Sequence, residues 1–189
     1  LPLALQRISY SFTADSQHVV VSPLQGTPNS NFWSIKPRFE ARWLQVASHL
    51  PRHLSFSPDS RYLLTAGAGP AYVWELATGK IVHTLRAARV GGWSPDGRWI
   101  ATGNYDEDGE PEHNLRVYDA ATGNLVWKKN NLPTTALAFT PDSKQLLVGS
   151  RENLALKRGK VSLLEIEAGK EVWSVNSALV RDISLSPQG

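Results

Sequence analysis

The chain of 189 residues contains no cysteine and no methionine. Without cysteine it has no disulfide bond, no thiolate zinc site and no cysteine nucleophile. Position 1 is a leucine rather than a methionine, so we expect the chain to be a segment of a longer protein.

Long apolar runs and strong charge are absent too. No run approaches 18 consecutive apolar residues, so no membrane-spanning segment is expected. Residues 1–7 lack the basic start and apolar stretch of a secretion signal, which makes a cytoplasmic location the expectation. The net charge of +3 is small, and Lys and Arg are scattered along the chain. Nucleic acid is therefore not an expected partner.

One short turn sequence recurs along the chain. It combines an aromatic residue, a serine or threonine and an aspartate, at residues 12–16, 56–60, 93–97 and 139–143, and a related sequence begins at 185. The steps from Asp15 to Asp59, Asp96, Asp142 and Gln188 are 44, 37, 46 and 46 residues. This period is typical of a four-stranded propeller blade rather than of a helix pair.

The second repeat shows the content of one unit. Residues 54–56, 62–66, 71–76 and 81–85 carry the apolar and β-branched residues of strands. Pro58 and Asp59 suit a tight turn between the first two strands, because Pro fixes φ and Asp bonds its own backbone. A glycine, Gly79, suits a positive-φ turn between the last two. Four strands, here termed a to d in chain order, make one blade.

The other repeats follow the same order, so we predict an all-β propeller segment that forms a single domain over residues 1–189. The predicted blades span residues 8–47, 52–86, 89–130 and 134–176, and the first strand of a further blade is expected within 179–189. Gly91 and Gly92 fall in strand a, the innermost strand of a blade, where backbones crowd and small residues fit. Such a segment would be part of a larger ring.

The repeats differ in length mainly at the connection between strands b and c. This connection is short at residues 67–70 and extended at 22–30, 104–113 and 150–159. In a propeller the b–c and d–a connections emerge on one face, so the long loops would gather there and leave the opposite face plain. Loops on a rigid scaffold often carry recognition. The candidate partner-binding residues on this face are Tyr105, Glu110, His113, Arg151, Lys157 and Arg158.

With the blades laid out, the chain resembles the WD-repeat propellers. The residues that carry the resemblance are the Ser-Pro-Asp turn, the strand-b hydroxyls Thr65 and Thr102, and the strand-c pairs Trp74-Glu75 and Tyr118-Asp119. The Gly-His dipeptide of eukaryotic WD repeats is missing, so the family network from that histidine to a strand-b hydroxyl and a strand-c tryptophan is incomplete. The pattern is more similar to the degenerate WD repeats of prokaryotic multidomain proteins.

This resemblance implies a non-catalytic platform for protein partners, and the identity of those partners is unknown. Two alternatives stay open. The propeller could serve an enzyme in the same longer chain, such as a peptidase or a kinase, or it could be a Tol-type periplasmic propeller. Because a fold does not dictate function, these are analogies.

The loop at residues 104–112 places oxygen ligands at alternate positions before a glycine, as the first half of a calcium loop does. The twelfth position, which would need a bidentate glutamate, is Leu115. Glu110 or Glu112 could take that role, but a solvated acidic loop is the expectation. No metal is therefore predicted.

A second motif resembles the tryptophan-docking repeat of quinoprotein dehydrogenases. It runs from Asp119 through Gly123 to Trp127, and Gly169 and Trp173 repeat its end. Those enzymes require a full ring around a quinone, and the Ser-Pro-Asp turns favour the WD type. The simpler interpretation is that Trp127 and Trp173 pack between neighbouring blades. No cofactor is expected.

Other catalytic patterns are missing. The five histidines fall at unrelated blade positions, and the chain contains neither a Gly-x-Ser-x-Gly elbow nor a phosphate-binding glycine loop. The basic residues in and beside one loop, Arg151, Lys157, Arg158 and Lys160, form a modest patch that could contact an acidic partner or nucleic acid, although a solvated face is the expectation. We therefore predict a protein that is not an enzyme. An open set of blades exposes strand edges, so the isolated segment is expected to self-associate or to need additional blades.

Overall fold

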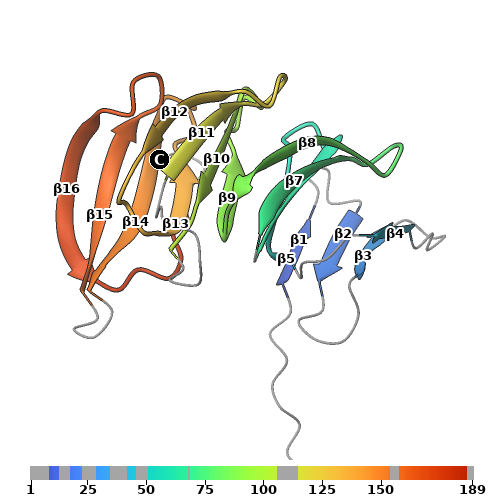
Figure 1. The fold of residues 1–189 in the computed structure, drawn as a ribbon, viewed down its shortest axis with the longest axis horizontal. Helices are drawn as coiled ribbons and strands as arrows, with labels where there is room; N and C mark the ends of the chain where they lie inside the picture. The colour runs from blue at the N-terminus through green and yellow to red at the C-terminus, as the bar shows by residue number, and fades with distance from the viewer. Residues whose placement is uncertain are drawn as a thin grey trace, which may run out of the picture.

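The computed structural model is described over residues 9–12, 18–22, 29–34, 42–45, 51–67, 69–105, 115–153 and 158–186. All of its regular elements in these ranges are strands, and they form four antiparallel sheets of four strands each (Figure 1). Within the same ranges, no helix is long and apolar enough to cross a membrane.

Each sheet is made of four strands that are consecutive in sequence, which is the predicted blade. Blade 1 contains β1 (Ser9–Phe12), β2 (His18–Ser22), β3 (Asn29–Ser34) and β4 (Arg42–Gln45). Blade 2 contains β5 (Pro51–Phe56), β6 (Tyr62–Gly67), β7 (Pro70–Glu75) and β8 (Lys80–Ala87). Blade 3 contains β9 (Val90–Trp93), β10 (Trp99–Gly103), β11 (Leu115–Asp119) and β12 (Leu125–Lys129). Blade 4 contains β13 (Thr134–Phe139), β14 (Gln145–Asn153), β15 (Arg158–Glu165) and β16 (Glu171–Ala178).

The first strands of the blades form an inner row. Strand β1 lies beside β5, β5 beside β9, and β9 beside β13, so the four blades follow one another around an arc (Figure 1). The glycines of β9 leave room for side chains of the neighbouring blades. A methyl group at Gly91 would lie 2.8 Å from Leu64 Cδ2 of β6, and one at Gly92 would lie 3.2 Å from Leu137 Cδ1 of β13. Small residues are thus favoured at both positions.

Two of the three described core clusters lie between neighbouring blades, and the third is formed by residues of blade 2. Facing residues of blades 3 and 4 form the largest cluster: Trp99, Ala101, Leu115, Val117, Phe139, Leu146, Val148, Leu164 and Ile166. A second cluster joins blade 2 to Ile100 and Tyr118 of blade 3. A fully buried Leu or Ile of this kind contributes roughly 1.5–3 kcal/mol to stability. Packing between neighbouring blades thus contributes to stability.

The recurrent turn sequence connects strands a and b through one repeated hydrogen-bond network. In blade 2, Ser57 Oγ donates to Asp59 Oδ1 (2.6 Å), and the backbone N–H of Tyr62 donates to Ser57 Oγ (2.9 Å). The Asp59 carboxylate also accepts from the backbone N–H of Arg61 at 3.1 Å. The same bonds recur around Asp96 and Asp142. The hydroxyl and the carboxylate recur in the sequence because they accept hydrogen bonds from backbone N–H groups of the turn that would otherwise lack a partner.

The segment after β16 differs from the prediction. Residues 179–186 do not form the expected first strand of a further blade. A strand requires a ladder partner on at least one side, and in the described part of the chain this segment has none. It nevertheless packs on blade 4: Thr135 Oγ1 donates to the Val180 carbonyl (2.6 Å), and a methyl group at Gly149 would lie 2.7 Å from Val180 Cγ1.

Candidate interaction surface

The b–c and d–a connections meet at one end of the blades, which we call the loop face. Backbone hydrogen bonds join the two kinds of connection: Arg89 N–H donates to the Gly103 carbonyl (2.8 Å), Thr134 N–H to Asn104 (3.2 Å) and Arg151 N–H to Pro133 (2.8 Å). The expectation that these connections share a face is confirmed. The opposite end carries the a–b and c–d turns, and we call it the turn face.

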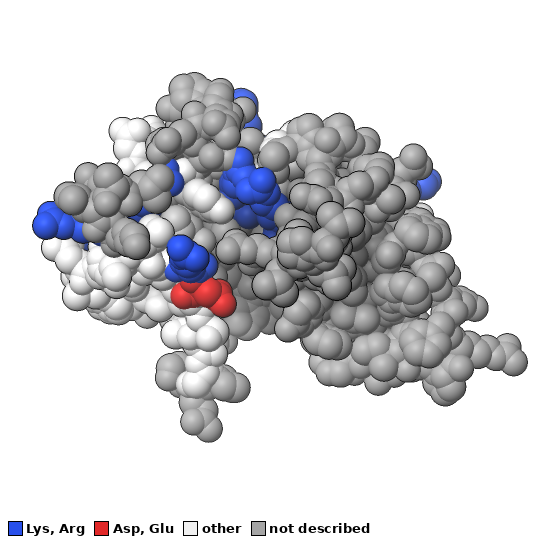
Figure 2. Space-filling model, turned by 90° about the horizontal axis from the view of Figure 1, so that it is seen from below, with Lys and Arg blue, Asp and Glu red and all other residues white. Residues whose placement is uncertain are grey.

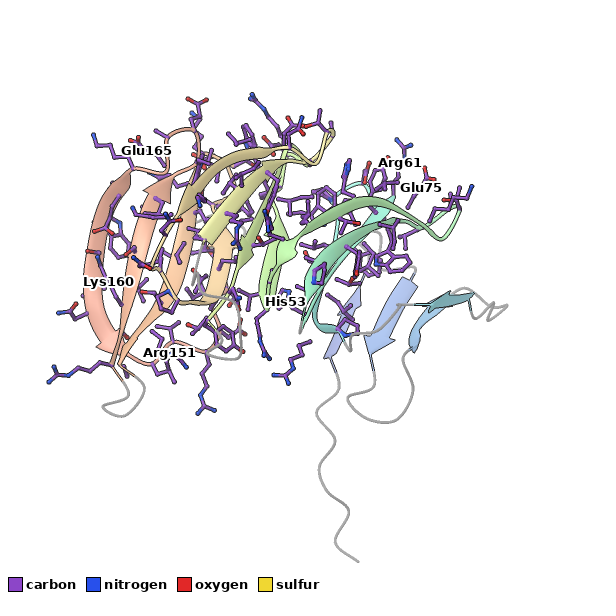
Figure 3. The ribbon with its side chains drawn as sticks, in the orientation of Figure 1. His53, Arg61, Glu75, Arg151, Lys160 and Glu165 are labelled. Atoms are coloured by element: carbon purple, nitrogen blue, oxygen red, sulfur yellow. The ribbon has the colours of Figure 1, made fainter. Side chains whose placement is uncertain are left out.

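Two of the predicted binding residues are brought together by this arrangement. Arg151, near the end of β14, donates from Nη2 to the backbone carbonyl of Tyr105 at 2.9 Å. Figure 3 shows Arg151 at the loop-face end of blade 4. This contact ties the start of the long blade 3 connection to blade 4, so Arg151 anchors the loop as well as adding charge.

A third predicted residue, Arg158, opens β15 and is exposed. Its backbone pairs with Asn153 on one side and with Ala178 on the other, which fixes its position on the loop face. The remaining predicted residues, Glu110, His113 and Lys157, lie outside the described residues. Most of the acidic loop at 104–113, considered above as a calcium site, lies outside them as well.

Further arginines lie on this face that the sequence analysis missed. Arg52 precedes His53 in β5, Arg89 precedes β9, and Arg181 follows β16. These arginines occupy equivalent positions in three repeats. Each lies seven residues before the fourth residue of its turn sequence, which is Asp59, Asp96 or Gln188 respectively. The shared arginine position could be found by aligning the repeats. The fold was needed to show that this position lies at the loop-face end of the inner row of strands.

Figure 2 views the loop face directly, and Lys and Arg clearly outnumber Asp and Glu among the residues drawn there. The described basic residues at or near this end of their strands include Arg52, Arg89, Arg151, Arg158 and Arg181. Arginine pairs with carboxylates in a bidentate geometry that lysine does not offer. The described part of the loop face is therefore suited to an acidic partner surface.

A partly buried histidine follows Arg52 on β5. This residue, His53, is labelled in Figure 3, and its buried Nδ1 atom has no hydrogen-bond partner among the described residues. Loss of solvation lowers the pKa of His53, and the nearby carboxylate of Asp182 opposes this shift without cancelling it. A lowered pKa favours the neutral imidazole, which is in keeping with a structural role.

The turn face is not plain, in contrast to the expectation. Two cavities open there, one of about 490 Å³ between blades 2 and 3 and one of about 560 Å³ between blades 3 and 4. Asp96 lines both of them. The sequence did not indicate these cavities, because each is formed by residues of two blades that meet only after folding.

Part of the WD side-chain network is formed. In blade 2, Trp74 Nε1 donates to Thr65 Oγ1 at 3.0 Å, and both residues are buried. In blade 4 the corresponding positions hold Val148 and Leu164, which are fully buried. The hydroxyl and the indole N–H are thus replaced together, so neither is left unpaired.

Residues of the tryptophan motif also have structural roles. The indole of Trp127 lies against Gly169, where a methyl group would be 3.1 Å from Cδ2, and its Nε1 donates to the Ile166 carbonyl (2.5 Å). The expectation that Trp127 packs between blades is confirmed. Trp173 is 45% exposed and no described blade follows blade 4, so its packing between blades stays a prediction.

These features define the class of protein: a β-propeller built from WD-type repeats. Among proteins of known sequence, the chain is similar to an uncharacterized WD repeat-containing protein of Synechocystis, with 32% identity over 103 residues, 51% of this chain and 28% of that protein. The family model PQQ_2, described as outer membrane protein assembly factor BamB, matches residues 18–186. The chain belongs to this family of propeller repeats.

Solved structures agree on the fold. The propeller domain of Cps50 (Swd1) from Myceliophteria thermophila superposes with a TM-score of 0.74 at 18% identity, covering 95% of this chain and 59% of that one. Hydrazine synthase from Kuenenia stuttgartiensis superposes with a TM-score of 0.73 at 15% identity, covering 89% and 48%. The chain thus spans 59% of the first structure and 48% of the second. At these sequence identities, the similarity concerns the fold alone.

Proposed function

We propose that this chain is a non-catalytic protein-interaction platform that binds an acidic surface of its partner through the loop face. The observation that carries the proposal is the set of arginines that the fold gathers there from four separate repeats. The link between Arg151 and the Tyr105 carbonyl adds support, because a connection anchored at its base presents its residues with a smaller loss of conformational entropy on binding.

The non-catalytic part of the proposal rests on how reactive side chains are used. Ser57, Ser94 and Thr140 each donate to an aspartate and accept from a backbone N–H, which are turn-forming bonds. His83 Nε2 lies 3.1 Å from the Ala120 carbonyl of the next blade. Each of these groups already has a structural partner, and a nucleophile needs a base that is free to take its proton.

Site-specific photo-crosslinking tests this proposal. A photoreactive amino acid is placed at position 158 on the loop face and, as a matched exposed control, at position 170 on the turn face. We expect a protein partner to be trapped from position 158 in the native host and not from position 170. Substituting Arg52→Ala and Arg89→Ala should then weaken binding of that partner, most strongly at low salt. Trapping only from position 170 would contradict the proposal.

A second candidate follows from the family match. The model that covers residues 18–186 is described as an assembly factor for outer membrane proteins, which would place this platform in the cell envelope rather than in the cytoplasm. Cell fractionation of the native host separates the two. Recovery with the periplasm or membranes would favour the envelope role, and recovery with the cytosol would favour a cytoplasmic platform.

We also propose that the isolated segment self-associates through the outer strand of blade 4. Val172, Trp173 and Val175 of β16 are 48%, 45% and 55% exposed. Large apolar side chains gathered on a terminal strand favour association, and β16 pairs on one side only, with β15.

A further inference from the structure

The cavity between blades 2 and 3 lies on the turn face, away from the proposed partner surface. Its volume of about 490 Å³ is within the range of ligand-binding pockets. The a–b turns of both blades contribute Asp59 and Asp96 to its walls, β8 contributes Val82 and His83, and aromatic rings come from Tyr62 and Trp93. We call this cavity the turn-face pocket.

The charge of the turn-face pocket is negative and unbalanced. Its described lining includes two carboxylates and neither Lys nor Arg. The neighbouring cavity between blades 3 and 4 differs, because Arg98 and Lys144 line it together with its acidic residues. Of the two cavities, only the turn-face pocket thus offers carboxylates without a basic residue in its own wall.

Both carboxylates are held in place. Hydrogen bonds from Ser57 Oγ and from the Arg61 backbone end on Oδ1 of Asp59, and equivalent bonds end on Oδ1 of Asp96. Burial alone would raise the pKa of Asp96, but bonds from Ser94, the Arg98 backbone and Ser143 keep it below its ordinary value. Asp96 is therefore ionised at neutral pH. A carboxylate has two acceptor oxygens, so Oδ2 of each aspartate can accept from a guest.

The aromatic wall suits a planar cation. The rings of Tyr62 and Trp93 stack with centroids 6.2 Å apart and planes inclined by 21°. The guanidinium carbon of Arg61 lies 5.6 Å from the Tyr62 centroid, so this ring already takes part in a cation–π contact at the turn face. Figure 3 shows Arg61 at that end of blade 2. Arg61 does not line the pocket, but its charge competes with any cationic guest.

We propose that the turn-face pocket binds the guanidinium group of an arginine from a partner polypeptide. Arginine fits better than lysine, because its flat group stacks on aromatic rings and pairs with carboxylates through two N–H donors. Partly exposed Val82, on the rim, offers apolar contact for the methylene stem. The pocket would give the platform a second contact surface of opposite charge to the described loop face.

Ligand-observed saturation-transfer NMR on the whole chain tests this proposal. The probe is an acetylated and amidated Gly-Gly-Arg-Gly-Gly peptide, and the control peptide carries citrulline, which keeps the shape but loses the charge. We expect about fivefold stronger transfer to the arginine side chain than to citrulline, as loss of a cation–π contact and an ion pair would produce. Equal transfer to the two peptides would overturn the proposal.

Matched variants locate the site. Asp59→Asn should lower transfer to the arginine peptide about fivefold, and Asp142→Asn should leave it unchanged. Asp142 has the same role in the blade 4 turn but does not line the turn-face pocket, so both variants remove the same kind of turn bonds. Equal loss in the two variants would contradict the assignment. Arg61→Gln should raise the transfer by removing a competing cation, and an unchanged signal there would also count against the pocket.

Discussion

At the scale of single residues, some buried polar groups are paired locally, whereas Trp93 Nε1 and His53 Nδ1 have no hydrogen-bond partner among the described residues. Thr65 and Trp74 bond to each other in blade 2, and an apolar pair takes both positions in blade 4. In blade 2 the hydroxyl and the carboxylate of the Ser-Pro-Asp turn bond to atoms within five residues. The blade 3 turn has a further bond to the next blade, because the Asp96 backbone N–H donates to Ser143 Oγ at 3.0 Å.

His53 is the residue at which we expect pH to change stability. Its pKa in the folded chain is below the ordinary value of 6.5 because of burial. Below pH 6.5 the unfolded chain therefore binds a proton at this site that the folded chain does not yet bind. The free energy of unfolding should fall as pH falls through this window, by up to about 1.4 kcal/mol per pH unit for one proton.

Urea unfolding of the parent chain and of His53→Gln between pH 7.5 and 5 measures this contribution. The difference in unfolding free energy between the two should shrink as pH falls, while the other histidines cancel from the comparison. Parallel pH profiles would show that His53 does not cause the effect. The lowered pKa values of Asp96, Asp119 and Asp142 act in a separate window below about pH 4, where protonation removes their stabilising bonds.

At the scale of elements, neighbouring blades meet through one repeated contact. A side chain of strand d contacts the glycine of the next c–d turn: His83 lies against Gly123 and Trp127 against Gly169. Both glycines have positive φ, 71° and 63°. The c–d turn thus uses glycine for two reasons, its backbone conformation and the approach of the neighbouring blade.

Alanine substitution separates these two reasons. Gly97 also has positive φ (74°), but a methyl group there would meet nothing closer than 3.8 Å. Gly97→Ala should cost about 1–2 kcal/mol from its left-handed backbone alone. Gly169→Ala adds contact with the Trp127 ring and should cost roughly a further 1–3 kcal/mol. Urea unfolding followed by circular dichroism measures both, and equal costs would mean that the packing of Trp127 does not contribute.

At the scale of the whole molecule, the arc of blades ends at β16. Trp173 occupies the place in blade 4 that Trp127 has in blade 3: both pair with the corresponding residue of strand c, Leu163 and Val117. The difference is that no described residue covers Trp173 as Gly169 covers Trp127. The end of the arc therefore offers the same kind of surface that joins the blades within it.

Sedimentation velocity tests the self-association proposed above. The parent chain should sediment as species larger than 20.8 kDa, and the double substitution Trp173→Lys and Val175→Lys should shift it towards monomer. Leu125→Lys serves as a control, because it adds the same charge to an exposed position of β12 that is not at the end of the arc. A parent chain that sediments as a monomer, or an equal shift in the control, would contradict the proposal.

The period of the turn sequence predicted the fold class and the four four-stranded blades, and the four strands predicted for the second repeat begin and end within three residues of β5 to β8. This success has a physical reason, because alternation of apolar residues and turn chemistry act over short distances along the chain. The prediction failed at 179–186, where strand formation depends on a ladder partner that local sequence does not supply. The packing of Trp173 between blades stays a prediction, since its neighbour across the blade interface is not determined by its own repeat.

The candidate interaction surface was likewise predictable from the sequence only in part. Tyr105, Arg151 and Arg158 could be proposed from the lengths of the connections, because a repeat fixes which loops share a face. The contribution of Arg52, Arg89 and Arg181, the bond from Arg151 to the Tyr105 carbonyl and the turn-face pocket required the tertiary structure. By itself, the sequence determined the blades, since the bonds that build them are local. Only the tertiary structure decided the surfaces, because residues from different blades become neighbours through packing.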